Sequence, residues 1–253
     1  MKLFLRHKEN FHPETLDFYQ KNFELTDVPT ESDIIVINDF EPVKTALTPV
    51  ACNSTGIDHI DAPKVISLRG EDLSDLTAVP ELCLAMAIYC TRIFKGEEVR
   101  GKTLGLIGYG RIAKRLAKIA SSVGMNVMIY DKCRIDWNVH DWAIDIDALC
   151  RNSDIVSLHI TADEENRNFI DKEKFEKMKD GAIFLNSSRD WLVDQKDLYW
   201  ALENKLSGAW VDFTIPYAEN LVTTPHLGGS TKESRQKSEM IIAKKLFKLY
   251  GTA

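Results

Sequence analysis

The chain has 253 residues, of which 44% are hydrophobic and 28% charged, and its formal net charge is −6. This composition is typical of a soluble globular protein with one large core or two modest ones. The acidic balance gives no basic surface for nucleic acid or for an anionic membrane, and no apolar run reaches the ~20 residues that span a bilayer. The five cysteines are scattered without a C-x-x-C pair. We therefore expect no zinc site, no disulfide framework and a cytoplasmic location.

The first part of the chain predicts strands at 2–7, 32–39 and 64–68, with a helix at 12–23 between the first two. A long helix follows at 79–94 and is apolar on most of its faces. A helix of this kind is usually buried on several sides, so it either bridges two domains or forms a dimer contact.

The second part repeats strand–helix–strand units from residue 103 to residue 213, and an amphipathic helix follows at 232–250. Alternation of this kind predicts an α/β fold with mostly parallel sheets. No internal repeat or flexible linker interrupts it.

A glycine-rich loop, "GLIGYGRIA" at 105–113, follows an apolar strand and opens a helix. Gly108 permits the tight turn, Gly110 lets the backbone approach a pyrophosphate, and the amides of Arg111 and Ile112 donate to phosphate at the positive end of the helix. The alternative is a strand–helix turn that binds nothing. The context favours a dinucleotide site.

An aspartate supports that interpretation. Asp131 ends the next strand about twenty residues beyond the loop, where a dinucleotide fold places the carboxylate that binds the adenosine ribose. A carboxylate there repels a 2′-phosphate, which favours NAD over NADP. Lys132 and Arg134 follow closely and could weaken that preference.

From Gly101 onward the chain resembles the D-isomer-specific 2-hydroxyacid dehydrogenases, which include phosphoglycerate, glycerate/hydroxypyruvate and phosphite dehydrogenases. The resemblance rests on "GKTLGLIGYGRIA", "SDIVSLHIT", "MKDGAIFLNSSRD", "GAWVDF" and "TPHLGGST", and upstream on "STGIDHID" and "AVPELCLAMA". It covers about four-fifths of a chain that is short for the family. It implies a Rossmann-type dinucleotide-binding domain, residues 74–227, inserted into a smaller flavodoxin-like α/β substrate domain, residues 1–73 plus 228–253, with the active site between them.

The resemblance also implies an NAD-dependent oxidoreductase acting on a small D-2-hydroxy or 2-oxo acid. Arg189 matches the substrate arginine, and its planar guanidinium can bind both carboxylate oxygens. His226 matches the acid/base histidine, whose ordinary pKa lets it give and take a proton. Taken alone, each could be a structural residue.

Further positions are implied more weakly. Asp212 corresponds to the aspartate that binds the nicotinamide carboxamide, Ser187 and Ser188 to residues along the ribose, and Gly228 and Gly229 to backbone close to the nicotinamide. His159 ends a strand facing the cofactor and is as readily structural as functional. Thr55 and Gly56 would offer amides to the substrate carboxylate.

The chain departs from the family at the glutamate that pairs with the histidine. The expected position falls near Tyr217, and the nearest carboxylate is Glu219, seven residues before His226. Glu219 is a candidate catalytic residue if it reaches His226 from the shortened loop and replaces that glutamate. We expect it instead to point to solvent, because a short connection with a proline before the histidine leaves little chain to fold back. Asp190 also stands where a glycine usually follows the arginine, and Trp191 comes next.

The sequence is also compatible with two other functions. One is a non-catalytic NAD-binding regulator with the same fold, and the other is a phosphite-type dehydrogenase. We expect a small-molecule substrate and a homodimer, and no metal, nucleic-acid or membrane partner.

Overall fold

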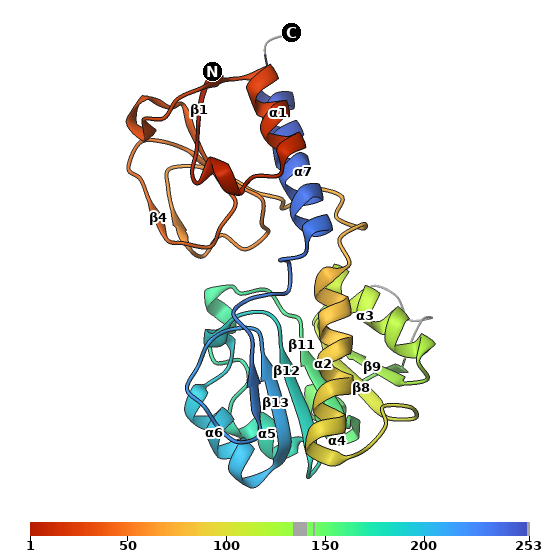
Figure 1. Ribbon diagram of the computed structural model, residues 1–253. Helices are drawn as coiled ribbons and strands as arrows, with labels where there is room; N and C mark the ends of the chain where they lie inside the picture. The colour runs from red at the N-terminus through yellow and green to blue at the C-terminus, as the bar shows by residue number, and fades with distance from the viewer. Residues whose placement is uncertain (134–140, 144, 252–253) are drawn as a thin grey trace. The chain divides into compact units, whose positions relative to one another are not determined.

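The computed structural model (Figure 1) describes residues 1–133, 141–143 and 145–251. The chain forms two compact units, residues 1–76 with 230–253 and residues 77–229. These divisions lie beside the boundaries 73/74 and 227/228 proposed from the sequence.

The first unit is built on a five-stranded parallel sheet in the order β2-β1-β3-β5-β7. The strands are β1 (Lys2–Leu5), β2 (Glu24–Leu25), β3 (Ile34–Ile37), β5 (Val50–Cys52) and β7 (Val65–Ile66). Numbered within the sheet alone, this is the flavodoxin-like order 2-1-3-4-5, as predicted. A separate pair, β4 (Val43–Lys44) and β6 (Ile60–Asp61), forms a small second sheet.

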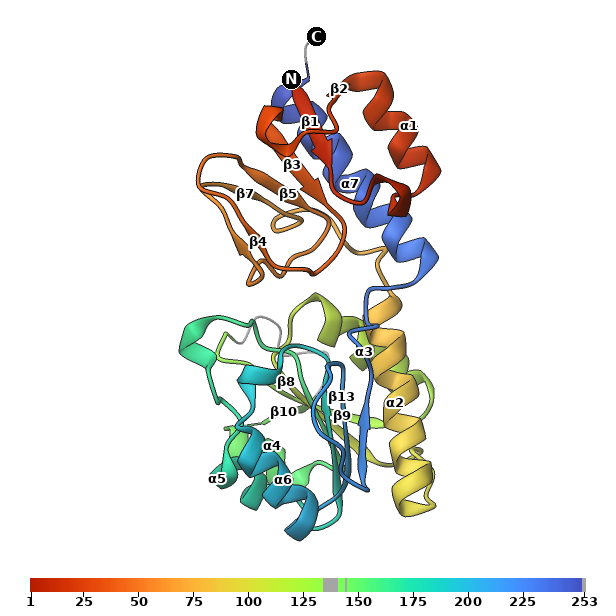
Figure 2. The same ribbon diagram turned by 60° about the vertical axis from the view of Figure 1, so that its left-hand side comes forward.

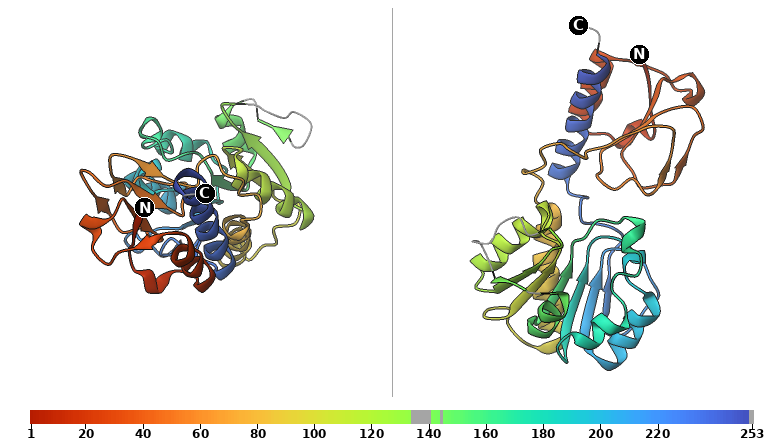
Figure 3. Two further views of the ribbon diagram at one scale, coloured as in Figure 1. Left: turned by 90° about the horizontal axis from the view of Figure 1, so that it is seen from above. Right: turned by 180° about the vertical axis from the view of Figure 1, so that it is seen from behind.

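Two helices far apart in sequence cover this sheet together. Helices α1 (Pro13–Asn22) and α7 (Lys232–Tyr250) lie side by side (Figure 3), with the rings of Phe18 and Phe247 edge to face at 6.0 Å. Ile242, Ala243 and Leu246 of α7 are fully buried against strand residues. Helix α7 therefore completes the hydrophobic core that residues 1–76 form.

The second unit contains a seven-stranded parallel sheet in the order β10-β9-β8-β11-β12-β13-β14. The strands are β8 (Thr103–Ile107), β9 (Asn126–Tyr130), β10 (Asp141–Trp142), β11 (Ile155–Leu158), β12 (Ala182–Asn186), β13 (Leu206–Val211) and β14 (Leu221–Thr223). Numbered from β8, this is the order 3-2-1-4-5-6 of a dinucleotide-binding sheet with one more edge strand, which confirms the Rossmann-type prediction.

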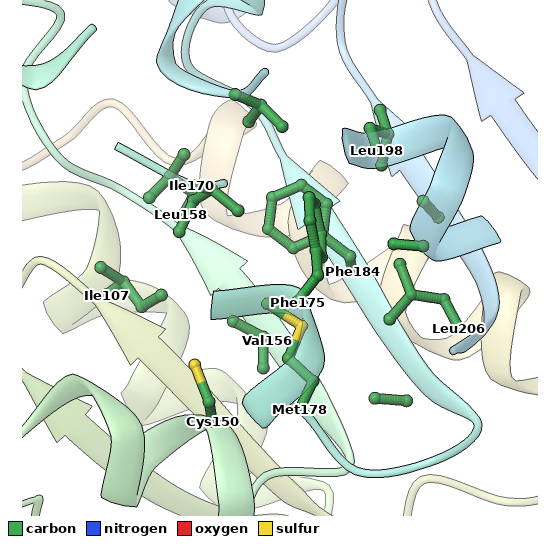
Figure 4. Close-up of a cluster of buried hydrophobic side chains, with 14 of the residues drawn as sticks. Ile107, Cys150, Val156, Leu158, Ile170, Phe175, Met178, Phe184, Leu198 and Leu206 are labelled. Carbon is green, nitrogen blue, oxygen red and sulfur yellow. The ribbon is translucent and has the colours of Figure 1, made fainter. Parts of the chain in front are cut away.

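Helices cover both faces of this sheet (Figure 2). On one face lie α2 (Ala78–Lys95) and α3 (Arg111–Ser122), and on the other lie α4 (Ile146–Asn152), α5 (Lys172–Lys177) and α6 (Gln195–Asn204). Because successive side chains of a strand point to opposite faces, strands buried on both sides are apolar at nearly every position. Figure 4 shows the buried cluster between the sheet and helices α4, α5 and α6, where the ring centroids of Phe175 and Phe184 are 5.3 Å apart.

Short turns connect these elements. They include the 3-10 turns Lys8–Asn10, Pro29–Glu31, Glu164–Asn166 and Asp190–Leu192. The carboxyl ends of all strands in a parallel sheet meet at one edge, and loops at that edge carry the predicted site residues of the second unit.

Candidate cofactor and active site

The glycine loop joins β8 to α3 at the point where the strand order reverses between β8 and β11. Gly108 has a φ of +91°, and a Cβ on it would lie 2.8 Å from the carbonyl oxygen of His159. Only glycine permits both the left-handed backbone and this close approach. The loop is thereby pressed against the end of β11.

Gly110 differs from Gly108 in its surroundings. It is the N-cap of α3, its φ of −76° is ordinary, and a Cβ on it would meet nothing within 4 Å. The first N–H groups of an α-helix have no partner within the helix, and Gly110 brings no side chain to cap them. The space above Gly110 and the positive helix end suit a pyrophosphate.

Asp131 follows β9 and holds the glycine loop. Its Oδ2 accepts a hydrogen bond from the Tyr109 amide at 2.6 Å, and its Oδ1 accepts one from the Cys133 amide at 2.7 Å. A carboxylate has about four acceptor positions, so this one can still accept bonds from ribose hydroxyls. Lys132 does not turn its charge toward Asp131 but pairs with Glu165 at 2.8 Å, which raises the pKa of Lys132. Arg134 lies outside the described residues.

His159 directly follows β11, and its carbonyl lies against Gly108 of the glycine loop. Its Nε2 lies 2.8 Å from the hydroxyl oxygen of Ser157, and burial lowers the pKa of His159 to about 4. The ring is therefore neutral at physiological pH and cannot serve as a proton donor there. Burial likewise lowers the pKa of Arg111, although a guanidinium keeps its charge.

The loop after β12 carries Ser187, Ser188 and Arg189. The buried side chain of Asn186 fixes it, since its Oδ1 accepts the Ser188 amide at 2.8 Å and its Nδ2 donates to the Arg189 carbonyl at 2.9 Å. The Ser188 hydroxyl donates to the Ile160 carbonyl at 3.2 Å, and Arg189 Nη1 donates to the Ser188 carbonyl at 3.0 Å. The arginine thus starts from a turn whose backbone is held on both sides.

A cysteine that the sequence analysis did not single out packs behind this loop. Cys83 of α2 is fully buried, and burial raises the pKa of its thiol to about 12 even though Ser187 hydrogen-bonds it. A thiol of that kind remains protonated and inert. Its position ties helix α2 to the serine loop.

Asp212 follows β13, is fully buried, and organises the segment that contains His226. Its Oδ1 accepts bonds from the Thr224 hydroxyl at 2.6 Å and the Leu227 amide at 2.7 Å, and its Oδ2 accepts the Gly228 amide at 2.7 Å. One acceptor position remains on Oδ2 by the same count. The carbonyl oxygen of Asp212 lies 3.1 Å from Nδ1 of His226.

The glycines after the histidine have different environments. A Cβ on Gly228 would lie 3.0 Å from Asp212 Oδ2 and 3.2 Å from a methyl group of Val79, whereas a Cβ on Gly229 would meet nothing within 4 Å. Close approach to Asp212 therefore explains why Gly228 is small.

Glu219 does not reach the histidine. Its side chain is exposed, and it forms no hydrogen bond or ion pair with His226 among the described residues. The segment it precedes adds strand β14 to the sheet, where Leu221 pairs with Ala209.

Thr55 and Gly56 belong to the first unit, in the loop after β5. The Ser54 hydroxyl donates to the Gly56 carbonyl at 2.5 Å, and Arg69 Nε donates to the Thr55 carbonyl at 2.9 Å. Arg69 was not predicted to contact this loop, and no local motif indicates it, because the two residues are fourteen positions apart. The arginine adds a positive charge beside the proposed carboxylate-binding amides.

The profile of the "D-isomer specific 2-hydroxyacid dehydrogenase, NAD binding domain" matches residues 89–228, more than half of the chain. The chain belongs to this family. The matched region contains the glycine loop, Asp131, Arg189 and His226. This dehydrogenase therefore has NAD as its cofactor, and the glycine loop and the open space above Gly110 fit that group.

Comparisons with known proteins agree. Hydroxypyruvate reductase of Thermotoga maritima is 29% identical over 90% of this chain and 88% of its own length. D-3-phosphoglycerate dehydrogenase of Methanocaldococcus jannaschii is 28% identical over 89% of this chain, which spans about half (51%) of that relative. The NAD⁺-bound 3-phosphoglycerate dehydrogenase of Entamoeba histolytica has the same fold, with a TM-score of 0.80, 20% identity and coverage of 100% of this chain and 96% of that one.

Two expectations concern what the chain does not bind. Among the described residues no group of three or more histidine, cysteine or acidic side chains is arranged to hold a metal ion. In the same part of the chain no helix is both long and apolar enough to cross a membrane.

Proposed function

We propose that the protein transfers a hydride between NAD and a small D-2-hydroxy acid or 2-oxo acid, with Arg189 holding the substrate and His226 as the acid/base. The observation that carries this proposal is the convergence of the glycine loop, the Arg189 turn and the His226 segment at one edge of the parallel sheet. Ligands of such sheets bind outside the carboxyl ends of the strands.

The residues divide the chemistry between them. NAD, when bound, supplies or accepts the hydride. The Arg189 guanidinium binds the carboxylate and polarises the carbonyl of the substrate. Nε2 of His226 donates the proton to the forming alkoxide during reduction and takes it back during oxidation. His159 does not substitute for His226, because its pKa of about 4 leaves it neutral.

The substrate, the acid/base role and the cofactor preference are tested together by a panel of 2-oxo acids with NADH and NADPH, followed by absorbance at several pH values. We expect NADH-dependent reduction of at least one small 2-oxo acid, with hydroxypyruvate and glyoxylate as first candidates. In Arg189→Lys the charge stays and the planar fork is lost, so kcat/KM falls ~100-fold while NADH binding is kept. Arg151→Lys, an exposed arginine of α4 paired with Asp147, is the matched control. Retained activity in Arg189→Lys would exclude Arg189 as the substrate arginine.

One observation favours an alternative, a non-catalytic NAD-binding regulator. Glu219, the carboxylate nearest to the position where the family has its glutamate, does not contact His226. NADH binding without turnover of any 2-oxo acid, or of phosphite with NAD⁺, would support the regulator. Turnover of phosphite alone would support the phosphite-type dehydrogenase. If the protein is an active enzyme, Glu219→Gln should not change the pH dependence of reduction.

We also propose a homodimer through helix α2. Its outer face exposes 39% of Ile88, 48% of Tyr89 and 58% of Ile93, an apolar stripe on the side opposite to Cys83, Ala87 and Cys90. Two-fold pairing is the most frequent closed symmetry. Light scattering at micromolar concentration should give twice the chain mass, and Ile93→Glu should give one chain mass. Val123→Glu, at the exposed residue that follows α3, should still give twice the chain mass. A monomer before substitution would refute the dimer.

The cytoplasm is the location we propose. All five cysteines are free, and four of them are buried. Thiols that remain unpaired suit a reducing compartment. Cell fractionation with an antibody against the chain tests this.

A further inference from the structure

We propose that Trp210, Thr224 and Asp212 form a hydrogen-bonded relay that positions His226, holding its Nδ1–H on the main-chain carbonyl of Asp212 so that Nε2 exchanges the proton with the substrate. This inference rests on the proposed function, because it concerns how the same histidine is oriented. The three residues are positioning residues, and none of them needs to touch the substrate for this role.

The relay runs through two side-chain bonds. The indole Nε1 of Trp210 donates to the Thr224 hydroxyl oxygen at 3.0 Å, and that hydroxyl donates its hydrogen to Asp212 Oδ1 at 2.6 Å. Trp210 and Asp212 are fully buried. Buried polar groups need hydrogen-bond partners, and the threonine hydroxyl is one of three donors to this carboxylate.

The backbone that carries the accepting carbonyl is fixed as well. The Asp212 amide donates to the Asn186 carbonyl at 2.9 Å, and the Thr224 amide donates to the Val211 carbonyl at 3.1 Å. The peptide groups on either side of the relay are thus anchored in the sheet. Leu227 and Gly228 are held by the same carboxylate, so Asp212 binds the chain on both sides of the histidine.

The contact of His226 defines its tautomer. A carbonyl oxygen can only accept, so the 3.1 Å contact requires the hydrogen on Nδ1 of His226. With Nδ1 protonated in both charge states, Nε2 is the nitrogen that gains and loses the catalytic proton. The Asp212 carbonyl thereby orients the imidazole ring, as a hydrogen-bond acceptor on Nδ1 commonly does for an acid/base histidine.

The backbone of the histidine shows that the relay holds an unfavourable conformation. His226 has a φ of +54°, in the left-handed region that residues other than glycine seldom adopt. Such a conformation persists only where surrounding contacts over-determine it. Three bonds from one buried carboxylate to Thr224, Leu227 and Gly228 supply those contacts.

The test compares two threonines that are adjacent in sequence. Thr224→Val keeps the shape and removes both hydroxyl bonds, whereas Thr223→Val makes the same change at an exposed position of β14. We expect Thr224→Val to lower kcat at saturating NADH at least ~10-fold, with the NADH dissociation constant within about twofold, because the histidine is misoriented rather than lost. Thr224→Ser, which keeps the hydroxyl, should restore most of kcat, and Trp210→Phe should give an intermediate loss. Equal kcat values for the two valine variants would overturn the relay.

A second measurement needs neither cofactor nor turnover. Two-bond ¹H–¹⁵N spectra of the ligand-free protein report which nitrogen of each imidazole carries the hydrogen, and His226→Asn assigns the signal among the six histidines. We expect the Nδ1–H form for His226 in the unmodified protein and in Thr223→Val, and a mixture of tautomers in Thr224→Val. The Nε2–H form in the unmodified protein would overturn the proposal. If no substrate is turned over, the proposed function fails while this measurement still decides the relay.

Discussion

Two aspartates end strands at the same edge of the seven-stranded sheet, and their surroundings differ. Asp131, after β9, is partly exposed and accepts two amide bonds, from Tyr109 and Cys133. Asp212, after β13, is fully buried and accepts three bonds, from Thr224, Leu227 and Gly228. Asp131 supports the glycine loop and remains accessible to solvent on one side. Asp212 is enclosed by the loop that it supports.

The difference separates binding from orientation. A carboxylate that solvent reaches can exchange water for ribose hydroxyls at small desolvation cost. A carboxylate surrounded by protein donors instead holds those donors in place, and removing one of its bonds leaves a polar group unsatisfied. The β8–β9 half of the edge is therefore suited to binding, and the β13–β14 half to holding the histidine.

Replacing each aspartate by asparagine tests this difference between Asp131 and Asp212, and Asp212→Asn should have the largest effect of the substitutions considered. In Asp212→Asn an NH₂ group faces an amide or hydroxyl donor, so we expect kcat to fall ~100-fold and the free energy of unfolding to fall by ~2–4 kcal/mol. In Asp131→Asn solvent can reach the site, so the free energy of unfolding should change by less than ~1 kcal/mol. The preference for NADH over NADPH should become ~10-fold smaller, because the carboxylate that repels the 2′-phosphate is lost.

Urea unfolding and cofactor titration measure both quantities for each variant. A larger loss of stability in Asp131→Asn than in Asp212→Asn would refute the division between the two halves. Equal affinity of the unmodified protein for NADH and NADPH would refute the assignment of Asp131 to the ribose.

The two glycines of the β8–β9 half give a second contrast. Gly108→Ala places a methyl group 2.8 Å from the His159 carbonyl at a φ of +91°, so we expect ~2–3 kcal/mol of destabilisation. Gly110→Ala meets open space at an ordinary φ, so it should cost only the preference for glycine over alanine at an N-cap, less than ~1 kcal/mol. If a pyrophosphate occupies that space, Gly110→Ala should still weaken NADH binding ~10-fold. Calorimetry supplies both values, and unchanged NADH binding in Gly110→Ala would place the pyrophosphate elsewhere.

The sequence could predict the β8–β9 half because its determinants are local. Strand, glycine loop and helix are contiguous, and Asp131 falls at the spacing that one βαβ unit imposes. The sheet orders of both units follow from the same alternation of strands and helices. These features require no knowledge of which distant side chains meet.

The β13–β14 half could not be predicted in the same way. The bonds from Asp212 to Thr224 and Gly228 join residues twelve and sixteen positions apart, across a connection that departs from the family pattern. Strand β14 is only three residues long and pairs with β13, whose residues lie at least ten positions earlier in the sequence. The sequence also gives no clear range for helix α6, although its N-cap Asp194 accepts the amides of Lys196 and Asp197. Its aromatic residues, Tyr199 and Trp200, obscure the helical pattern.

His159 lies between the two halves, at the end of β11, and its titration gives the smallest expected effect. Burial lowers the pKa of His159 from the ordinary 6.5 to about 4. Below pH 6.5 the unfolded chain therefore binds a proton that the folded chain excludes, so stability present above pH 6.5 is lost as the pH falls toward 4.

Between pH 7.5 and pH 5 this should remove ~1–2 kcal/mol of unfolding free energy, because the partly buried ring retains some hydration. Since His159→Gln carries no titratable group, its loss of stability over the same range should be smaller by that amount. His7→Gln, an exposed histidine beside Glu9 and Glu41, should follow the unmodified protein closely. Urea unfolding at pH 7.5, 6.5, 5.5 and 5 provides the curves. Parallel curves for the unmodified protein and His159→Gln would show that His159 titrates alike in the folded and unfolded chains, and the ring would then be available as a proton donor beside the glycine loop.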